Sequence, residues 1–205
     1  MRAKEYAMIY AIVLAAGGSR RMGSQKLLLP FGGKKVITHI VDELLVSRVD
    51  QVIVVVGSEG ELVERELSER SVGIVANPDY SRGMLSSVRC GMEVLPTECS
   101  AVMAVLGDQP SISRELVDGM ILTFGKTGKG ILVPCYRGKH GHPLLFMVKY
   151  RDEIMTSFDE TGLRGLILAH PEDVFEMDVS DSSVLSDIDS PEDYRRETED
   201  FGEEC

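Results

Sequence analysis

The chain has 205 residues, enough for one substantial hydrophobic core, and its 43% hydrophobic and 27% charged residues are typical of a globular protein. The net charge of -11 argues against a nucleic-acid partner, and no apolar run is long enough to cross a bilayer. The charge is uneven: residues 171–205 hold 14 acidic and 2 basic residues, which leaves 19 acidic and 20 basic residues elsewhere, a nearly neutral body compatible with polyanion binding.

The first apolar stretch, Met8 to Ala16, follows a charged start and superficially resembles a signal peptide. It leads directly into a loop that carries Arg20, Arg21 and Lys26, so we interpret it as a buried strand. The four cysteines show no C-x-x-C spacing, which predicts free thiols rather than a zinc or redox pair. We therefore expect a cytoplasmic protein.

Apolar runs rich in valine and isoleucine then alternate with amphipathic stretches, the pattern of repeated βα units. Strands are predicted at residues 9–14, 51–56, 73–75, 101–106 and 131–135. Helical periodicity covers residues 36–46, 59–67, 85–95 and 114–124. These elements predict a three-layer α/β/α Rossmann-like fold with a mostly parallel sheet whose strands are covered by helices on both faces.

After Cys135 the pattern changes to a polar loop followed by the short apolar run 144–148, which predicts a small antiparallel extension. Helices are expected at 149–157 and 162–169, and a strand at 174–177. Ser190 and Pro191 have the residue types of an N-cap and a first helical position. We expect a single domain over 1–197 with a short terminal helix, then a frayed acidic tail over 198–205.

The loop after the first strand, within LAAGGSRRMGSQK (residues 14–26), combines small residues with cations. Small residues let backbone amides approach a phosphate chain, and Arg or Lys adds charge-assisted contacts. The loop lacks the Lys-Ser/Thr of a Walker A motif and the G-x-G-x-x-G of a dinucleotide site. A nucleoside triphosphate is the predicted ligand; the alternative is a glycine-rich connection with solvated cations.

A second loop, Gly107-Asp108-Gln109-Pro110, follows the apolar run 101–106. A carboxylate at the end of a central strand is well placed to hold Mg²⁺ on phosphate oxygens. Taken alone, Asp108 could equally begin a turn or cap the next helix. Beside a triphosphate loop, the metal role is favoured.

Together the two loops resemble the MobA-like nucleotidyltransferases, whose signature is LAAG-x-S-x-R-M-G-x-x-K and whose metal-binding segment is similar to GDQP. Further matches are NPDYSRGMLSSVRCG (77–91), GHP (141–143) and DIDSPEDY (187–194), in order through nearly the whole chain. The resemblance is strongest to the molybdenum cofactor cytidylyltransferase branch, whose members transfer CMP from CTP to molybdopterin-bound molybdenum and serve enzymes of the xanthine dehydrogenase type.

The resemblance implies a role for each matching residue. Arg21, Lys26 and Asp108 would be catalytic, with Asp108 and Asp189 on Mg²⁺. The nucleotide would contact Leu14, Ala15, Ala16, Gly17, Arg21, Lys26, Asn77, Gly83, Ser86 and Ser87. The pterin acceptor would face Gly141, His142 and Pro143. Whether Asp187 or Asp189 meets the metal stays open; if both lie on one strand, alternation would put them on the same face.

One segment departs from the branch. Where its members have G-D-x-G-x-R, this chain has Asp159-Glu160-Thr161-Gly162-Leu163-Arg164, so the acceptor is less firmly implied than the donor. Two alternatives stay open: a nucleotidyltransferase acting on another phosphorylated acceptor, such as a sugar phosphate or an isoprenoid precursor, and a nonenzymatic carrier of the finished molybdenum cofactor.

Overall fold

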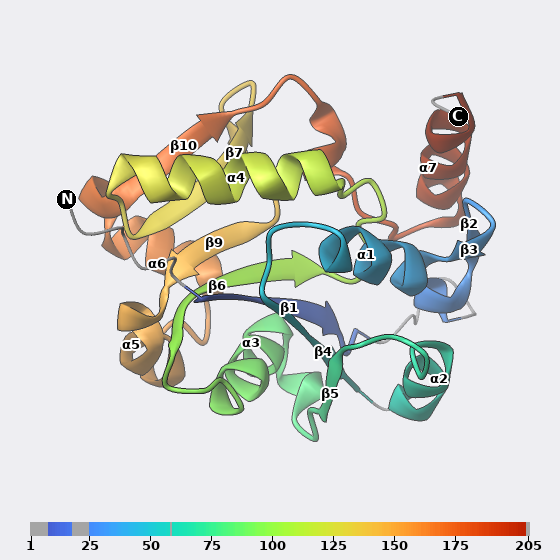
Figure 1. The fold of residues 1–205 in the computed structure, drawn as a ribbon, viewed down its shortest axis with the longest axis horizontal. Helices are drawn as coiled ribbons and strands as arrows, with labels where there is room; N and C mark the ends of the chain where they lie inside the picture. The colour runs from blue at the N-terminus through green and yellow to red at the C-terminus, as the bar shows by residue number, and fades with distance from the viewer. Residues whose placement is uncertain (1–7, 18–24, 58, 204–205) are drawn as a thin grey trace.

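The computed structural model describes residues 8–17, 25–57 and 59–203. Its main sheet has the strand order β10-β7-β9-β6-β1-β4-β5, and β8 pairs with β7 (Figure 1). The pairs β1/β4, β1/β6, β4/β5 and β7/β10 are parallel, whereas β9 runs antiparallel to both β6 and β7. The strands are β1 Met8–Ala15, β4 Gln51–Val56, β5 Gly73–Ala76, β6 Cys99–Leu106, β7 Ile131–Tyr136, β8 Lys139–His140, β9 Leu144–Met147 and β10 Val174–Asp178.

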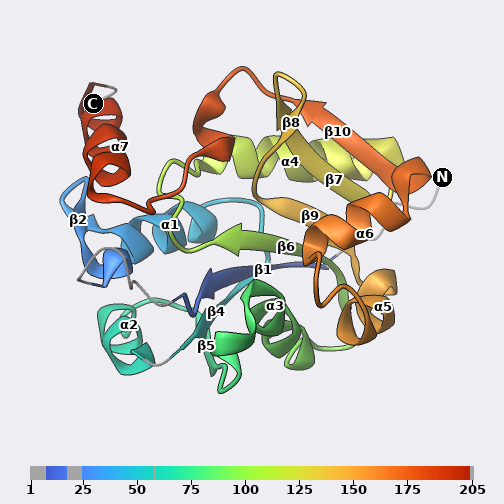
Figure 2. The same cartoon turned by 180° about the vertical axis from the view of Figure 1, so that it is seen from behind.

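Helices cover both faces of this sheet. On one face lie α1 Val36–Leu45, α2 Gly60–Glu66 and α4 Arg114–Thr127, which are in front of the sheet in Figure 1. On the other face, turned toward the viewer in Figure 2, lie α3 Met84–Glu93, α5 Arg151–Thr156 and α6 Leu163–Ala169. The predicted α/β/α fold with a mostly parallel sheet and a small antiparallel part is confirmed.

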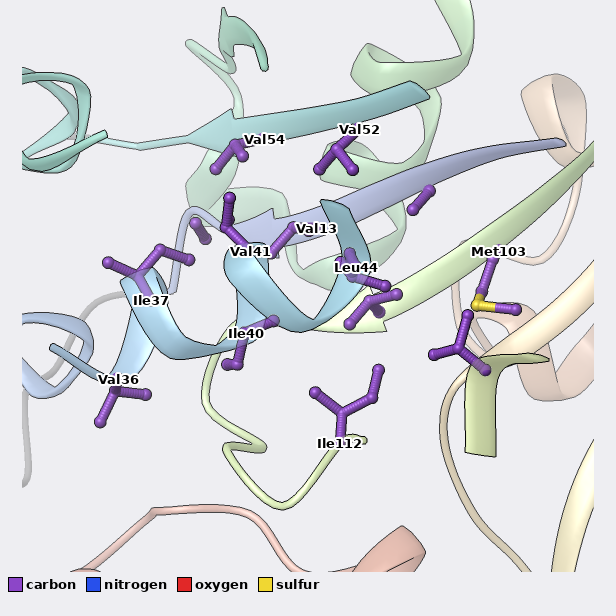
Figure 3. Packing of buried hydrophobic residues seen from close by; sticks show 14 of the residues in the cluster. Val13, Val36, Ile37, Ile40, Val41, Leu44, Val52, Val54, Met103 and Ile112 are labelled. Atoms are coloured by element: carbon purple, nitrogen blue, oxygen red, sulfur yellow. The ribbon is translucent and has the colours of Figure 1, made fainter. Parts of the chain in front are cut away.

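Alternation along the strands divides the core into two layers. In β1, Ala11 and Val13 face the layer of α1 and α4, while Ile12 faces the layer of α3. Figure 3 shows the first layer, where Val41 of α1 lies beside Val13 of β1 and Val54 of β4. Because both faces are buried, the inner strands are apolar at nearly every position and carry no polar side.

Short elements escaped the sequence prediction. The chain after β1 contains the 3₁₀ turn η1 Lys26–Leu28 and a two-stranded hairpin of β2 Pro30–Phe31 and β3 Lys34–Lys35. Further 3₁₀ turns are η2 Tyr80–Arg82, η3 Val148–Tyr150, η4 Pro171–Asp173 and η5 Ser182–Leu185. Elements of two to four residues are too short to show the periodicity on which such predictions depend.

The C-terminal helix corrects one expectation. Helix α7 spans Pro191–Glu203, so residues 198–203 are helical and the expected fraying of this part was wrong. The ring of Phe201 lies 4.7 Å from Phe31 and 5.1 Å from His39 between ring centroids, and it fills the space that a Cβ at Gly32 would need. These contacts anchor the end of α7 on the hairpin and α1. That residues 1–197 form one domain stays a prediction.

Two smaller expectations concern thiols and membranes. Cys90, Cys99 and Cys135 are free, as predicted, and Cys205 lies outside the described residues. In the described part of the chain, no helix combines the length and apolar character needed to span a bilayer.

Candidate active site at the carboxyl edge of the sheet

The direction of chain addition reverses at β1. From β1 the chain builds β4 and then β5 on one side, and it returns to place β6 on the other side. Ligands of open α/β sheets bind at the carboxyl ends of the strands beside such a switch point. Both loops singled out from the sequence start there, after β1 and after β6.

Glycines bring these loops into contact. The amide of Gly107 donates to the carbonyl oxygen of Leu14 at 3.1 Å, and a Cβ at Gly107 would lie 2.8 Å from that oxygen. After β4, a Cβ at Gly57 would lie 2.7 Å from the carbonyl oxygen of Ala16. A side chain at either position would separate the loops, so the glycines fix the spacing at the switch point.

Lys26 joins the predicted catalytic residues. Its Nζ lies 2.5 Å from Oδ2 of Asp108 and 3.1 Å from Oδ1 of Asp189, and it donates to the carbonyl oxygen of Ile188 at 2.7 Å. The Lys26 side chain is 11% exposed. Burial lowers the pKa of Lys26, but Asp108 and Asp189 outweigh it and hold that pKa above its usual value. Residues 163 positions apart thus form one charged cluster with a protonated ammonium.

A third carboxylate belongs to this environment. Burial raises the pKa of Asp187, and the like charges of Asp108 and Asp189 raise it further. Asp187 and Asp189 are exposed on either side of the buried Ile188, and no strand forms there, so the strand alternation considered above does not apply. Among the described residues no group of three His, Cys, Asp or Glu side chains is arranged to hold a metal ion. Asp108 and Asp189 nevertheless interact electrostatically with Asp187, and the Lys26 ammonium contacts both Asp108 and Asp189.

The small residues predicted beside the nucleotide lie at the end of β1. Ala15 and Ala16 are 5% and 7% exposed, and Gly17 has open space where a Cβ would be. At Gly17 the backbone can therefore approach a ligand closely. Arg21 lies outside the described residues.

Asn77 organises the second group of predicted nucleotide residues. This side chain is 4% exposed; its Nδ2 donates to Oγ of Ser86 at 2.9 Å and to Oγ of Ser87 at 3.0 Å. Its Oδ1 accepts from the amide of Asp79 at 2.9 Å. Gly83 has a φ of 101°, a conformation that glycine adopts without strain. The structure therefore brings Asn77, Ser86 and Ser87 together at the start of α3.

A cavity of about 470 Å³ adjoins Asn77 and Ser86 and extends to Asp159 in the segment that departs from the family pattern. Its wall includes Arg89, which the sequence analysis missed. Arg89 contacts Oδ1 of Asp159 at 2.6 Å and donates to the carbonyl oxygens of Ile154 and Ser157. The Asp that stands in place of the family's glycine is thus held by an ion pair.

The predicted acceptor residues form a loop between β8 and β9, with a cis peptide bond between His142 and Pro143. The amide of His142 donates to the carbonyl oxygen of Val184 at 2.8 Å. Its ring Nδ1 is buried without a hydrogen-bond partner among the described residues. Burial lowers the pKa of His142, and the charge of Asp108 partly opposes this effect. The acceptor loop therefore lies within electrostatic reach of Asp108.

Residues 183–189, here called the bridging segment, connect the two loops. The amide of Ile188 donates to the carbonyl oxygen of Asp108 at 2.9 Å, and Nε2 of Gln109 donates to that of Ser183 at 2.7 Å. Gln109 is 4% exposed. Its position inside GDQP was visible in the sequence, but nothing local indicated a partner 74 residues away.

A family model described as the MobA-like NTP transferase domain matches residues 11–174. The chain belongs to this family. It is therefore a nucleotidyltransferase of the MobA type, and the matched region contains Lys26, Asp108 and His142 of the site.

Individual relatives match over nearly their whole length. The chain is 28% identical over 187 residues to the molybdenum cofactor cytidylyltransferase of Escherichia coli K12, covering 91% of this chain and 93% of the relative. It is 28% identical over 197 residues to nicotine blue oxidoreductase of Paenarthrobacter nicotinovorans, covering 92% and 95%. It also resembles a protein of Mycobacterium tuberculosis H37Rv crystallised with manganese, with a TM-score of 0.79 at 26% identity, covering 94% and 99%.

Proposed function

We propose that this protein transfers CMP from CTP to the molybdopterin cofactor and releases pyrophosphate. The observation that carries the proposal is the Lys26 ammonium held by Asp108 and Asp189 at the switch point, with the His142 loop beside it. The cytidylyltransferase relative, matched along nearly all of both chains, supports CTP and molybdopterin as substrates.

Mg²⁺ is the proposed cofactor. Carboxylate oxygens of the type supplied by Asp108 and Asp189 are the ligands that hard divalent cations prefer. Burial is the main cause of the raised pKa of Asp187, and the like charges of Asp108 and Asp189 add to it; a cation would relieve that repulsion. Asp108 and Asp189 would hold the ion, and when bound it would neutralise phosphate charge. The manganese complex of the mycobacterial protein supports a divalent cation in this fold.

The chain's own residues would act mainly by positioning and charge. A terminal phosphate of the acceptor is ionised near neutral pH, so its attack on the α-phosphorus of CTP needs no strong general base. The ammonium of Lys26 would stabilise charge that develops on the phosphates, and it is protonated for this role. Arg21 would join Lys26 on the triphosphate.

The remaining predicted residues would place the two substrates. Backbone at Leu14, Ala15, Ala16 and Gly17 would contact the base and ribose. The nucleotide would also lie beside a second set of residues, namely Asn77, Gly83, Ser86 and Ser87. Gly141, His142 and Pro143 would face the pterin. The product would serve a molybdoenzyme of the xanthine dehydrogenase type in the cytoplasm, without nucleic acid or membrane as a partner.

Titration calorimetry with CTP, GTP and ATP, each with and without Mg²⁺, tests the donor. We expect tight binding of CTP that depends on Mg²⁺; a preference for GTP would overturn the cytidylyl assignment. Pyrophosphate release with molybdopterin, a sugar phosphate and methylerythritol phosphate tests the acceptor. Tight binding of the finished cofactor without CTP consumption would instead indicate a carrier.

A further inference from the structure

The bridging segment contacts both halves of the proposed site. On the donor side, its Ile188 carbonyl accepts from Lys26 Nζ and its Ile188 amide donates to the carbonyl oxygen of Asp108. On the acceptor side, its Val184 carbonyl accepts from the amide of His142. Val184 and Ile188 are 2% and 0% exposed, so one buried side chain anchors the segment near each loop.

The acceptor loop is pressed directly against this segment. A Cβ at Gly141 would clash with the carbonyl oxygen of Val184 and lie 2.8 Å from its Cβ. Any shift of Val184 therefore moves or releases the loop that carries His142. The position of the acceptor residues depends on the bridging segment.

We propose that Gln109 is a positioning residue that holds the bridging segment, and through it the acceptor loop, in register with the Lys26 and Asp108 pair. Its Nε2 donates to the carbonyl oxygen of Ser183, one residue before the carbonyl that binds His142. Gln109 follows Asp108 directly, so any movement of one is transmitted to the other. The role in acceptor use rests on the proposed function.

The reason that position matters is the in-line geometry of the transfer. Two substrates must meet with their reacting atoms aligned, and a misplacement of about 1 Å can cost a reaction roughly 100-fold. The contacts of Lys26 and of the Asp108 backbone fix the donor end of the segment. The buried amide of Gln109 fixes the end that meets His142.

Gln109→Met tests the role, because methionine keeps the length and apolar volume of glutamine and removes the donor. We expect the KM for molybdopterin to rise about 10-fold, while calorimetry shows CTP affinity with Mg²⁺ changed less than 2-fold. Ser111→Ala is the matched control: it removes a hydrogen bond from the same loop, but that bond reaches Glu197 on α7 and not the bridging segment. Its acceptor KM should stay within 2-fold of wild type.

Amide hydrogen exchange provides a readout that needs no substrate. In Gln109→Met, the amide of His142 should exchange at least 10-fold faster, while amides of β6 keep their wild-type rates and report an intact sheet. If wild type transfers no CMP, the proposed function fails, and exchange alone still decides whether Gln109 holds the loop.

Two results would overturn the proposal. One is a Gln109→Met protein with wild-type acceptor KM and wild-type exchange at His142; the other is a loss of CTP affinity equal to the loss of acceptor use. Should that variant not fold, Gln109→Leu removes the same donor with a shorter apolar side chain. It should raise the acceptor KM in the same way, and an unchanged KM would be equally contradictory.

Discussion

Each edge of the sheet carries a cluster of lysine and aspartate side chains, but the two clusters differ in how the carboxylates are paired. At the amino edge, before β7 and β10, Asp173 contacts Lys149 at 2.5 Å and also accepts hydrogen bonds from Tyr150 and from the amide of Gly130. Although burial acts against it, this pairing lowers the pKa of Asp173 to about 2. At the carboxyl edge, Lys26 lies against two carboxylates, and Asp187 has its pKa raised.

The difference separates stability from function. A carboxylate with a lowered pKa contributes to folding, whereas acids crowded together disfavour their own ionised form. Perturbed groups of the second kind gather where a ligand supplies the missing charge. Substitutions at the amino edge should therefore affect unfolding, and those at the carboxyl edge should affect turnover.

Asp108→Asn should produce the largest effect. Asparagine keeps the shape and removes the charge, so we expect pyrophosphate release to fall about 100- to 1000-fold, the scale for losing one electrostatic contact in a transition state. Lys26 keeps Asp189, so urea unfolding should change by less than about 1 kcal/mol. The control is Glu61→Gln, at an exposed acid on α2, which should leave pyrophosphate release and the free energy of unfolding unchanged. A folded Asp108→Asn protein with turnover near wild type would remove Asp108 from the mechanism.

Asp173→Asn should show the reverse pattern. We expect the free energy of unfolding at pH 7 to fall by about 1 to 2 kcal/mol, a value reduced from the full pKa shift because Lys149 is half exposed. Turnover at 25 °C should stay at the wild-type level. Glu172→Gln, the exposed neighbour, should leave the free energy unchanged within 0.5 kcal/mol, a small effect typical of surface changes. Equal loss of turnover and stability would break the contrast between the edges.

The difference in unfolding free energy between wild type and Asp173→Asn should depend on pH in one direction. The pKa of Asp173 is lower in the folded state than its ordinary 3.8, so its stabilisation is complete above that value and lost as the pH falls toward 2. The gap between wild type and Asp173→Asn should be constant from pH 7 to 5 and about half as large at pH 3. Urea unfolding at these pH values measures it, and a gap that grows on acidification would contradict the assignment.

Phe201→Ala tests whether the end of α7 contributes to stability beside the carboxyl edge. This helix starts just after Asp189, and Tyr194 Oη donates to the carbonyl oxygen of Pro30 at 2.5 Å, near Lys26 in sequence. Loss of the partly buried ring should lower the free energy of unfolding by about 1 kcal/mol, below the range for a fully buried Phe. Glu199→Ala, exposed on the same helix, is the matched control. An effect no larger than that of the control would mean that the helix end contributes nothing.

Asp187→Asn should have the smallest effect on the free energy of unfolding, and it should raise that free energy where Asp173→Asn lowers it. Because the pKa of Asp187 is raised in the folded state, its ionised form costs stability at neutral pH, and this cost disappears once the group is protonated. Although part of the Asp187 side chain is desolvated, solvent still reaches it, so screening limits the expected gain to less than about 0.5 kcal/mol at pH 7 without Mg²⁺. Urea unfolding should show no gain at pH 3, and a loss of stability at pH 7 would contradict the coupling.

Local pattern was sufficient for most of the fold. The strand predicted at 51–56 is confirmed residue for residue, and the helix predicted at 36–46 differs from α1 by one residue. In these elements apolar residues recur with a regular spacing over many positions, and this signal depends only on residues close in the chain. The η turns and the β2–β3 hairpin lack such a period. Residues 198–203 were misjudged because their acidic composition hid Phe201, which finds its partners in Phe31 and His39.

The sequence by itself identified the residues of the proposed donor side, since Lys26 and Asp108 each lie in a contiguous motif at the end of a strand. Tertiary structure decided how these residues combine. The contacts from Lys26 to Asp189 and from Gln109 to Ser183 join positions far apart in the chain, and the ion pair of Arg89 with Asp159 links two loops. Such partners depend on strand order and loop path, which no local pattern records. The loop predicted to face the acceptor is held by a contact of the same kind, from the amide of His142 to the carbonyl oxygen of Val184.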